Sequence, residues 1–407
     1  MHHNLILNKL PILDADKKLY AYQLNVTPLP NLALQGLNWE EESQALWAGV
    51  EEHIGLDVLT AGKPVFYQAP IQMLSLDLLP AVEPLSQLYV EVNIDFLSNK
   101  KALAAIKEIM QAGVKIALTD FEANEANEKL LSIAKLVKIH PQGLTSAALQ
   151  EMIGNLRAKN LQVVLMDVET EEMFEILKQQ GGALFQGYFF TNPIVSTQQE
   201  VASNKLAMLK LLGEVNNPDA EFSALAAIIG SDVGLTHKLL AAINHPQNNL
   251  PYVVESLKEA VNFMGLKRLK FWVNMLMLSE VDDVPMELLV TALVRGKFLE
   301  SIAETLQRKD EMDRYFMVGL FSTLNAFLKA PMVDIIDELP ISDEVKSALV
   351  SQEGKMGKAL FVARAMEQGN IQLIFAGFEG LDIMAISSNY MDASGWARKT
   401  LDSLKAA

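Results

Sequence analysis

Short apolar runs rich in β-branched residues recur between residues 63 and 190, with helix-like stretches between them. They repeat about every 20 to 26 residues, the spacing of successive βα units. The runs are VFYQ at 65–68, YVEV at 89–92, VKIALTD at 114–120, LVKIH at 136–140, QVVLMDV at 162–168 and FQGYFF at 185–190. This alternation predicts an α/β domain built on parallel strands.

One of these units shows how the pattern works. Apolar residues recur at helical spacing over 103–110, and Gly113 supplies a stop signal before a buried strand at 114–118. Thr119 and Asp120 follow that strand. In a closed barrel of such units, functional groups lie at the carboxyl ends of the strands. The polar residues at these ends are therefore the candidates for a site.

The pattern changes after Pro193. From there the chain shows helical periods with almost no strand-like alternation, interrupted by turn signals. We expect an all-α second domain, with residues 371–407 helical in part. The predicted division is a barrel at 1–198 and a helical domain at 199–407.

Composition narrows the class of protein. Half of the residues are hydrophobic and 21% are charged, which excludes a disordered chain. The absence of cysteine rules out disulfides and thiolate metal sites and favours a cytoplasmic location. No apolar stretch reaches the about 18 residues of a membrane span, and the first residues lack a signal-peptide core, so we expect no export and no membrane partner.

The formal net charge of −16 argues against binding to nucleic acid or to an anionic membrane surface. Lys267, Arg268 and Lys270 form the best candidate for a local basic patch. We interpret them as a solvated helix face, because three basic residues on one helical stretch are usually that.

The chain resembles a known family at its last predicted strand. Gln186–Phe190, followed by Asn192–Pro193, resembles the closing QGY-(F/L)-F-x-x-P segment of EAL domains, the phosphodiesterases that open cyclic di-GMP. Further landmarks agree in order and spacing: Pro11–Ile12, Val90–Glu91, Asp120–Phe121, Val137–Lys138–Ile139 and Val168–Glu169–Thr170.

The second half resembles the HDOD domain, a helical relative of HD phosphohydrolases, in residues 225–244 and 255–272. Together the two resemblances indicate the EAL–HDOD family of bacterial signalling proteins. They imply a modified TIM-type (EAL-like) barrel followed by an all-helical HDOD domain.

The resemblance also implies which residues would perform the chemistry, and most are replaced. In the family, two divalent cations held by carboxylates and an Asn activate water. Gln23 stands where the family has the Glu that begins its name motif, and Thr27 stands where that motif has an Arg. Gln68 aligns best with the metal-binding Asn.

Three further positions depart from the family. Thr119 replaces the first of two adjacent Asp residues, His140 replaces the Asp after Lys-Ile, and Met166 replaces the Glu before the G-V-E-T segment. Glu91, Asp120 and Glu169 keep their carboxylates. We therefore predict no meaningful hydrolysis and no cofactor, with Mg²⁺ or Mn²⁺ needed only if residual phosphodiesterase activity exists.

The remaining polar residues form a vestigial or candidate cyclic-dinucleotide pocket: Gln23, Gln68, Glu91, Asp120, Lys138, His140, Glu169 and Gln186. Two interpretations stay open. Lys138, Glu91 and Asp120 can form a satisfied buried ion-pair cluster, which we favour, or a ligand site. His140 is either a hydrogen-bonded side chain, which we favour, or a zinc ligand together with Asp120 and Glu91.

The helical half offers no hydrolase motif. An HD phosphohydrolase needs an adjacent His-Asp pair, and this chain has no such dipeptide. Its histidines in that half are His237 and His245. Phosphate-loop, nucleophile-elbow and H-E-x-x-H motifs are also absent from the sequence.

We favour a catalytically inactive signalling protein that contacts unknown signalling proteins, mainly through its helical domain. An apolar stripe there fits either a partner groove or, as we favour, core packing: Met264, Trp272, Met275, Met277 and Leu278. The alternative is a cyclic-di-GMP receptor that binds without cutting, and residual phosphodiesterase activity ranks third. The family resemblance suggests motility or biofilm control.

Overall fold

The computed structural model describes the chain in thirteen stretches. They are residues 4–29, 37–93, 96, 99–122, 124, 128–195, 203–217, 221–230, 233–246, 250–281, 284–370, 372–374 and 381–405. The chain forms two compact units, one of Met1–Asn192 with Val362–Gly395 and one of Pro193–Phe361 with Trp396–Ala407. This division differs from a single cut at residue 198, because residues 362–395 group with the barrel.

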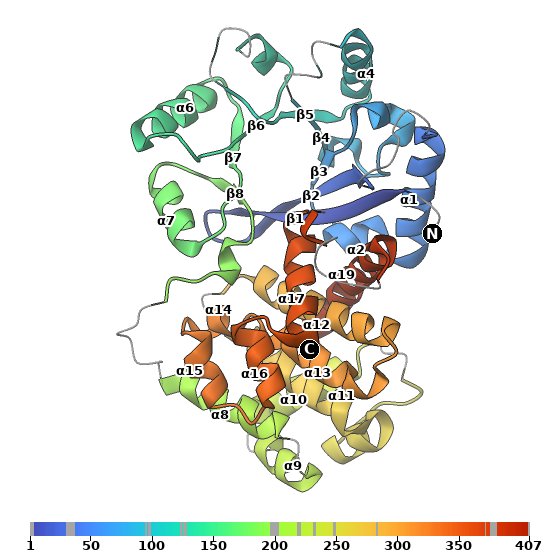
Figure 1. Cartoon of the computed structure of the whole chain (residues 1–407), viewed down its shortest axis with the longest axis vertical. Coiled ribbons are helices and arrows are strands. Elements are labelled where there is room, and N and C mark those ends of the chain that lie inside the picture. Colours follow the sequence, from blue (N-terminus) through green and yellow to red (C-terminus); the bar gives the residue numbers. More distant parts are fainter. Residues whose placement is uncertain are drawn as a thin grey trace. The chain divides into compact units, whose positions relative to one another are not determined.

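Eight strands in sequence order close the first unit into a barrel (Figure 1). The strands are β1 (Leu5–Asp14), β2 (Leu19–Pro28), β3 (Val65–Gln68), β4 (Leu88–Val92), β5 (Lys115–Leu118), β6 (Leu136–Ile139), β7 (Gln162–Leu165) and β8 (Leu184–Gln186). β1 pairs antiparallel with β2 and β8, while the pairs from β2 to β8 are parallel. The predicted modified TIM-type barrel is confirmed.

Helices surround this ring of strands (Figure 1). They are α1 (Trp39–His53), α2 (Leu56–Thr60), α4 (Lys100–Gln111), α6 (Ser146–Ala158) and α7 (Glu171–Gln179). α4 confirms the helix predicted over 103–110: Asn99 caps its amino end through the amides of Lys101 and Ala102. Gly113, with φ of 99°, provides the left-handed turn into β5.

The predicted strand at 185–190 is wrong beyond Gln186. Gly187 has φ of 141°, and a side chain there would meet the backbone of Val168. The chain therefore leaves the sheet at this glycine, and a 3₁₀ turn forms at Phe189–Thr191. The aromatic residues of that turn pack as a core cluster with Phe174 and Phe185.

The barrel interior is closed at one level by a layer of apolar side chains from every strand. They are Ile12, Ala21, Phe66, Tyr89, Ala117, Leu136, Val164 and Leu184. Phe66 and Tyr89 stack with ring centroids 4.4 Å apart. Since side chains alternate along a strand, Gln23 faces inward like Ala21, and Tyr22 faces outward. The polar residues thus lie on the carboxyl-end side of a packed layer.

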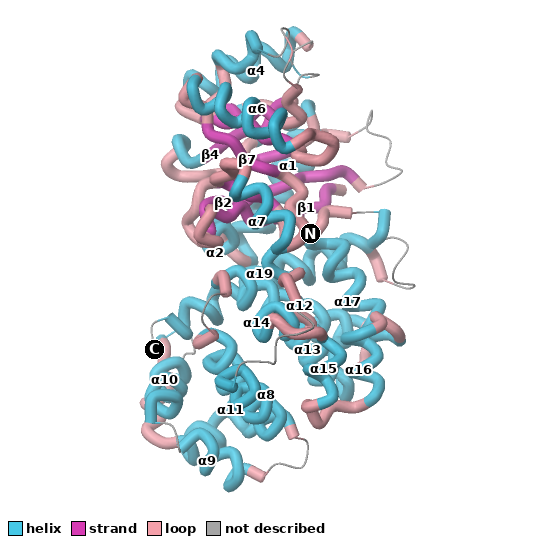
Figure 2. Tube along the Cα trace, turned by 90° about the vertical axis from the view of Figure 1, so that its left-hand side faces the viewer, coloured by secondary structure: helices cyan, strands magenta, loops and turns pink. Residues whose placement is uncertain are grey.

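Every described secondary-structure element of the second unit is a helix, and loops connect these helices (Figure 2). The helices that begin in it are α8 (Ser203–Asn216), α9 (Phe222–Gly230), α10 (Val233–Ile243), α11 (Leu257–Ser279), α12 (Met286–Thr305), α13 (Met312–Phe321), α14 (Leu324–Leu328), α15 (Met332–Asp337), α16 (Asp343–Val350) and α17 (Gly354–Glu367). α19 (Ile383–Lys405) follows, and the unit boundaries fall within α17 and within α19.

The apolar stripe of α11 belongs mainly to the core. Trp272, Met275, Met277 and Leu278 are buried, while Met264 is half-buried. This supports core packing over a partner groove. Gly265, with φ of 81°, interrupts the helix between Met264 and the buried part.

The basic residues of α11 do not form one patch. Lys267 pairs with Asp313, and Lys270 donates to the carbonyl of Asn217 at 2.9 Å. Burial lowers the pKa of Lys270. Two of the three basic side chains therefore have partners within the helical unit, which supports a structural role for them over a binding patch. None of the helices in the described ranges combines the length and the apolar character needed to cross a membrane.

Candidate functional site

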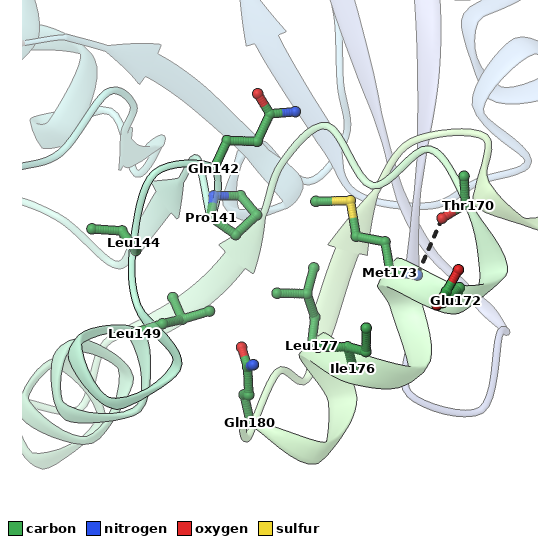
Figure 3. Close-up of a pocket in the computed structure, with 10 residues that line it drawn as sticks. All are labelled: Pro141, Gln142, Leu144, Leu149, Thr170, Glu172, Met173, Ile176, Leu177 and Gln180. Carbon is green, nitrogen blue, oxygen red and sulfur yellow. Dashed lines mark hydrogen bonds between the residues drawn. The ribbon is translucent and has the colours of Figure 1, made fainter.

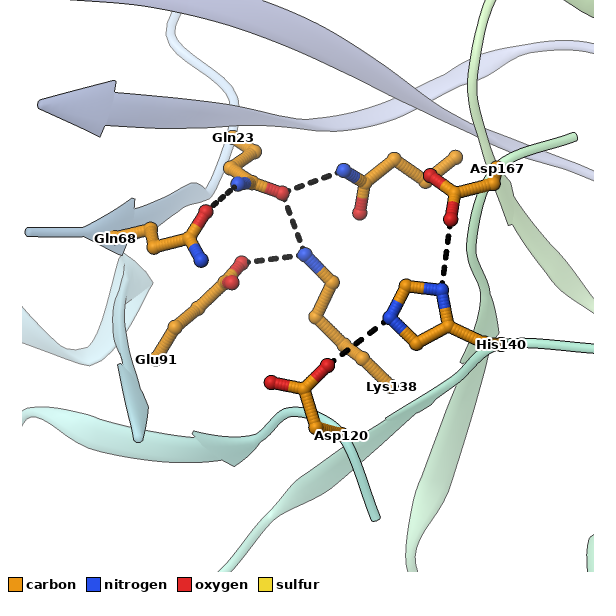
Figure 4. A network of polar contacts seen from close by, with 8 residues as sticks. Gln23, Gln68, Glu91, Asp120, Lys138, His140 and Asp167 are labelled. Atoms are coloured by element: carbon orange, nitrogen blue, oxygen red, sulfur yellow. Dashed lines mark hydrogen bonds and ion pairs between the residues drawn. The ribbon is translucent and has the colours of Figure 1, made fainter. Parts of the chain in front are cut away.

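A buried polar cluster lies inside the barrel at the carboxyl ends of its strands (Figure 4). We call Gln23, Gln68, Glu91, Lys138 and Gln186 the Lys138 cluster. The Lys138 ammonium donates to Gln23 Oε1 at 2.5 Å and to Glu91 Oε1 at 2.6 Å. The side chains of both Lys138 and Glu91 are 0% exposed. This is a fully buried ion pair.

Gln23 is the centre of the Lys138 cluster. Its Oε1 also accepts from Gln186 Nε2 at 2.5 Å, and its Nε2 donates to Gln68 Oε1 at 2.6 Å. One side chain from β2 thus connects β3, β6 and β8. A glutamine suits this position because its amide both accepts and donates, whereas a carboxylate only accepts.

The electrostatics of the Lys138 cluster depend on its buried ion pair and, to a smaller extent, on attraction of the ammonium by Asp167 and Asp120. Burial lowers the pKa of Lys138, while attraction from Glu91 and their hydrogen bond oppose that effect. Two acceptors, Glu91 Oε2 and Gln186 Oε1, are buried with no hydrogen-bond partner among the described residues. The cluster therefore has spare capacity for hydrogen-bond donors.

A second, exposed group lies beside it, and we call Asp120, His140 and Asp167 the His140 bridge. His140 Nε2 is 3.0 Å from Asp120 Oδ1, and His140 Nδ1 is 2.7 Å from Asp167 Oδ2. The three residues follow β5, β6 and β7, so the barrel brings its neighbouring strand ends together. Each contact places a ring nitrogen of His140 against a carboxylate oxygen, which accepts hydrogen bonds when it is ionised.

Sequence reasoning missed Asp167, which it placed within the strand run at 162–168. Strand β7 ends at Leu165, and Asp167 has a left-handed φ of 54°, as does Asp120. Asp is one of the few non-glycine residues that adopts this conformation readily. The signal available in the sequence was an Asp two residues after the end of a parallel strand, the same position that Asp120 has after β5.

The structure separates the other predicted residues into different roles. Asp120 does not join Lys138 and Glu91 in the ion-pair cluster but faces His140. Glu169 is exposed, and its backbone carbonyl accepts a hydrogen bond from Asn192 Nδ2 at 2.8 Å. Met166 is buried, and Thr27 contacts Asn25.

These residues do not fit the family's pair of divalent cations. The one inward carboxylate, Glu91, is bound by an ammonium, and Gln23 and Gln68 offer neutral amides that bond to each other. Both ring nitrogens of His140 face carboxylates, those of Asp120 and Asp167. This arrangement disfavours the alternative of a zinc site formed by His140, Asp120 and Glu91. Within the described ranges, no group of three or more His, Asp or Glu residues is arranged to hold a metal ion.

A recess of about 310 Å³ lies elsewhere on the barrel unit, next to α6 and α7 (Figure 3). Its lining includes Leu144, Leu149, Met173 and Ile176. Leu144 and Ile176 are among the exposed large apolar side chains of the chain. None of the predicted site residues lines this recess.

Replacing His140 with glutamine should lower the free energy of unfolding by less than about 1 kcal/mol, because an exposed ion pair contributes little. His140, Asp120 and Asp167 keep 42%, 53% and 51% of their side-chain surface exposed. Chemical denaturation of the variant and the wild type measures the difference. A loss of several kcal/mol would show that the His140 bridge is a structural element of the barrel.

Comparison with protein families identifies the class of both units. The EAL domain model matches residues 66–193, and the HDOD domain model matches residues 203–333. The chain therefore combines an EAL domain with an HDOD domain, as the sequence resemblance predicted. The EAL match begins after β2, so the segment with Gln23 and Thr27 lies outside it.

Two curated proteins are similar over most of the chain. Cyclic di-GMP phosphodiesterase CdgJ of Vibrio cholerae is 28% identical over 330 residues, which cover 79% of this chain and 75% of CdgJ. The uncharacterized protein YuxH of Bacillus subtilis is 23% identical over 401 residues, which cover 96% of this chain and 98% of YuxH.

Solved structures are similar to the barrel half. BlrP1 of Klebsiella pneumoniae, in a manganese and cyclic-di-GMP complex, is 18% identical with a TM-score of 0.39, over 46% of this chain and 56% of that one. An EAL domain protein of Listeria monocytogenes is 17% identical with a TM-score of 0.36, over 46% of this chain and 87% of that one.

Proposed function

We propose that this chain is a catalytically inactive EAL–HDOD signalling protein that acts through protein–protein interaction in cyclic-di-GMP-related regulation. The observation that carries the proposal is the buried Lys138 ammonium, held between Gln23 and Glu91. The residues available for cation binding are instead used to satisfy one another. The carboxylate of the Lys138 cluster, Glu91, is already paired with the Lys138 ammonium. The cluster therefore lacks the negative charge that two dications require.

The loss of chemistry follows from the same arrangement. Phosphodiester hydrolysis by this class needs metal-bound water and charge neutralisation at the phosphate. The chain places two glutamines, a lysine and a histidine bridge at the strand ends, and Met166 supplies no base. A cytoplasmic location is part of the proposal and rests on the cysteine-free sequence.

Exposed apolar side chains in the helical unit support the interaction role. Tyr252 is 55% exposed, Val253 is 68% exposed and Phe263 is 37% exposed. The rings of Tyr252 and Phe263 meet edge to face with centroids 5.7 Å apart. Aromatic residues exposed together are typical of interface hot spots. We call these three residues the Tyr252 patch.

Replacing Tyr252 and Phe263 together with serine should weaken capture of a signalling partner by about tenfold or more, because two aromatic anchors are lost. Affinity isolation from cells of the source organism, compared with the wild type, measures the change. Val333→Ser, an exposed apolar residue on α15, is the matched control and should retain capture. Equal capture by all three proteins would remove the Tyr252 patch from the proposal.

A second candidate function is a cyclic-di-GMP receptor that binds without cutting. The unpartnered buried acceptors Glu91 Oε2 and Gln186 Oε1 favour it, since a guanine offers N–H donors. Calorimetric titration with cyclic di-GMP in the absence of divalent cations separates the two candidates. Saturable heat that Gln186→Leu abolishes would support the receptor, and no heat would leave the interaction role.

A further inference from the structure

The first hairpin of the barrel needs a cover that its own sequence does not provide. β1 and β2 are joined by a short turn, with no helix between them. The outward-facing hairpin residues Lys9 and Tyr22 are nevertheless buried, with 4% and 1% of their surface exposed. Between β4 and β5, β6 and β7, and β7 and β8, a connecting α-helix performs this task.

Residues 362–395 belong to the same compact unit as this hairpin, and we call the described ones, 362–370, 372–374 and 381–395, the C-terminal clasp. Gly369 has φ of 65°, and a Cβ built on it would lie 2.6 Å from Asn8 Nδ2. Gly395, on α19, would place a Cβ 3.4 Å from Ile54 Cβ, just after α1. Two glycines thus allow the clasp to approach the barrel closely at two separate points.

A partly buried polar contact joins the clasp to the segment that follows the last strand of the barrel. The hydroxyl groups of Tyr188 and Tyr390 are hydrogen-bonded, and Tyr188 donates to the carbonyl of Lys9 at 3.2 Å. Burial raises the pKa of Tyr188, and nearby Tyr390 and Glu367 raise it further. Tyr390 and Glu367 are each 2% exposed. These contacts lie between the clasp, β1 and the end of β8.

The barrel residues that contact the clasp are close in sequence to the Lys138 cluster. Tyr22 faces outward and directly precedes Gln23, which faces inward. Tyr188 lies two residues beyond Gln186, after the sharp turn at Gly187. Successive side chains of a strand point to opposite faces, so Tyr22 and Gln23 share one stretch of backbone.

We propose that the C-terminal clasp is an integral part of the EAL barrel and positions Gln23 and Gln186 in the Lys138 cluster from behind. Tyr390 is the main positioning residue, acting through Tyr188. We further expect the affinity of the Lys138 cluster for a ligand to depend on the clasp, and this expectation rests on the proposed function. The family matches end at residue 333, so neither assigns this role to the segment.

Cysteine cross-linking tests the placement of the clasp in the full chain, which has no native cysteine. Ile54→Cys with Gly395→Cys joins positions whose Cβ atoms lie 3.4 Å apart, at the short end of the spacing of about 3.5 to 4.5 Å found in disulfides. We expect near-complete cross-linking under mild oxidation. The control pairs Ile54→Cys with Gly154→Cys, whose built Cβ has no atom within 4 Å. Equal cross-linking of both pairs would overturn the proposal.

Hydrogen exchange tests positioning without any ligand. Tyr390→Phe should speed exchange in peptides covering β2 and residues 184–191 by about fivefold, the effect of one lost hydrogen bond on local opening. Tyr67→Phe is the control, because its buried hydroxyl has no hydrogen-bond partner among the described residues. Unchanged exchange in Tyr390→Phe would refute the positioning role. A failure to bind cyclic di-GMP would leave both measurements intact.

Discussion

Replacing Lys138 with methionine should lower the free energy of unfolding of the barrel by about 3 to 5 kcal/mol, because it leaves the buried Glu91 carboxylate without its cation. The two side chains are fully buried and 2.6 Å apart. The double variant Lys138→Met with Glu91→Leu should recover much of this loss, since it removes both charges. Chemical denaturation followed by the far-ultraviolet circular dichroism signal measures all three proteins.

The matched control is Lys135→Met, one residue before β6. Lys135 is exposed, so its loss should change the free energy of unfolding by no more than about 0.5 kcal/mol. A Lys138→Met variant as stable as the Lys135→Met control would mean that Lys138 and Glu91 do not form a buried pair in solution. The proposed loss of the metal site would then have no structural basis.

Gln23→Leu should cost about 2 to 4 kcal/mol, because three hydrogen bonds disappear and the amides of Gln68 and Gln186 lose a shared partner. Leucine has nearly the same volume, so cavity formation contributes little. Gln162→Leu, at an exposed position of β7 with one contact to Tyr20, is the control and should cost less than about 1 kcal/mol. Similar losses for the two variants would show that Gln23 is not the centre of the Lys138 cluster.

Much of the barrel could be predicted from sequence because its strands are short, buried and β-branched. VFYQ became β3 with the predicted bounds, and the run at 136–140 became β6. The run at 185–190 failed after Gln186 because the conformation of Gly187 and its close approach to Val168 depend on tertiary packing. Aromatic periodicity alone could not show this.

The sequence predicted which residues form the candidate site better than it predicted which of them contact one another. Lys138 and Glu91 were expected to pair and do so, while Asp120 was expected with them and faces His140 instead. Asp120 has a left-handed backbone conformation, and its side chain is 53% exposed. Asp167 was missed because it was assigned to a strand.

The clasp could not be predicted because nothing in a local pattern shows that a distant helix will cover a strand. Residues 362–367 and 383–395 have ordinary helical sequences. The contacts of Gly369 with Asn8 and of Gly395 with Ile54 join positions more than three hundred residues apart. The contact of Tyr390 with Tyr188 joins positions about two hundred residues apart. Only the assembled structure places them in the barrel unit.

The central claim is that the barrel no longer opens cyclic di-GMP. The direct test incubates the full-length protein with cyclic di-GMP for hours in Mg²⁺ or Mn²⁺ and separates the products by chromatography, with CdgJ of Vibrio cholerae as the comparison enzyme. The account predicts no linear dinucleotide above the protein-free rate with either metal. Metal-dependent formation of the linear product, abolished by a chelator and by Glu91→Gln, would contradict it.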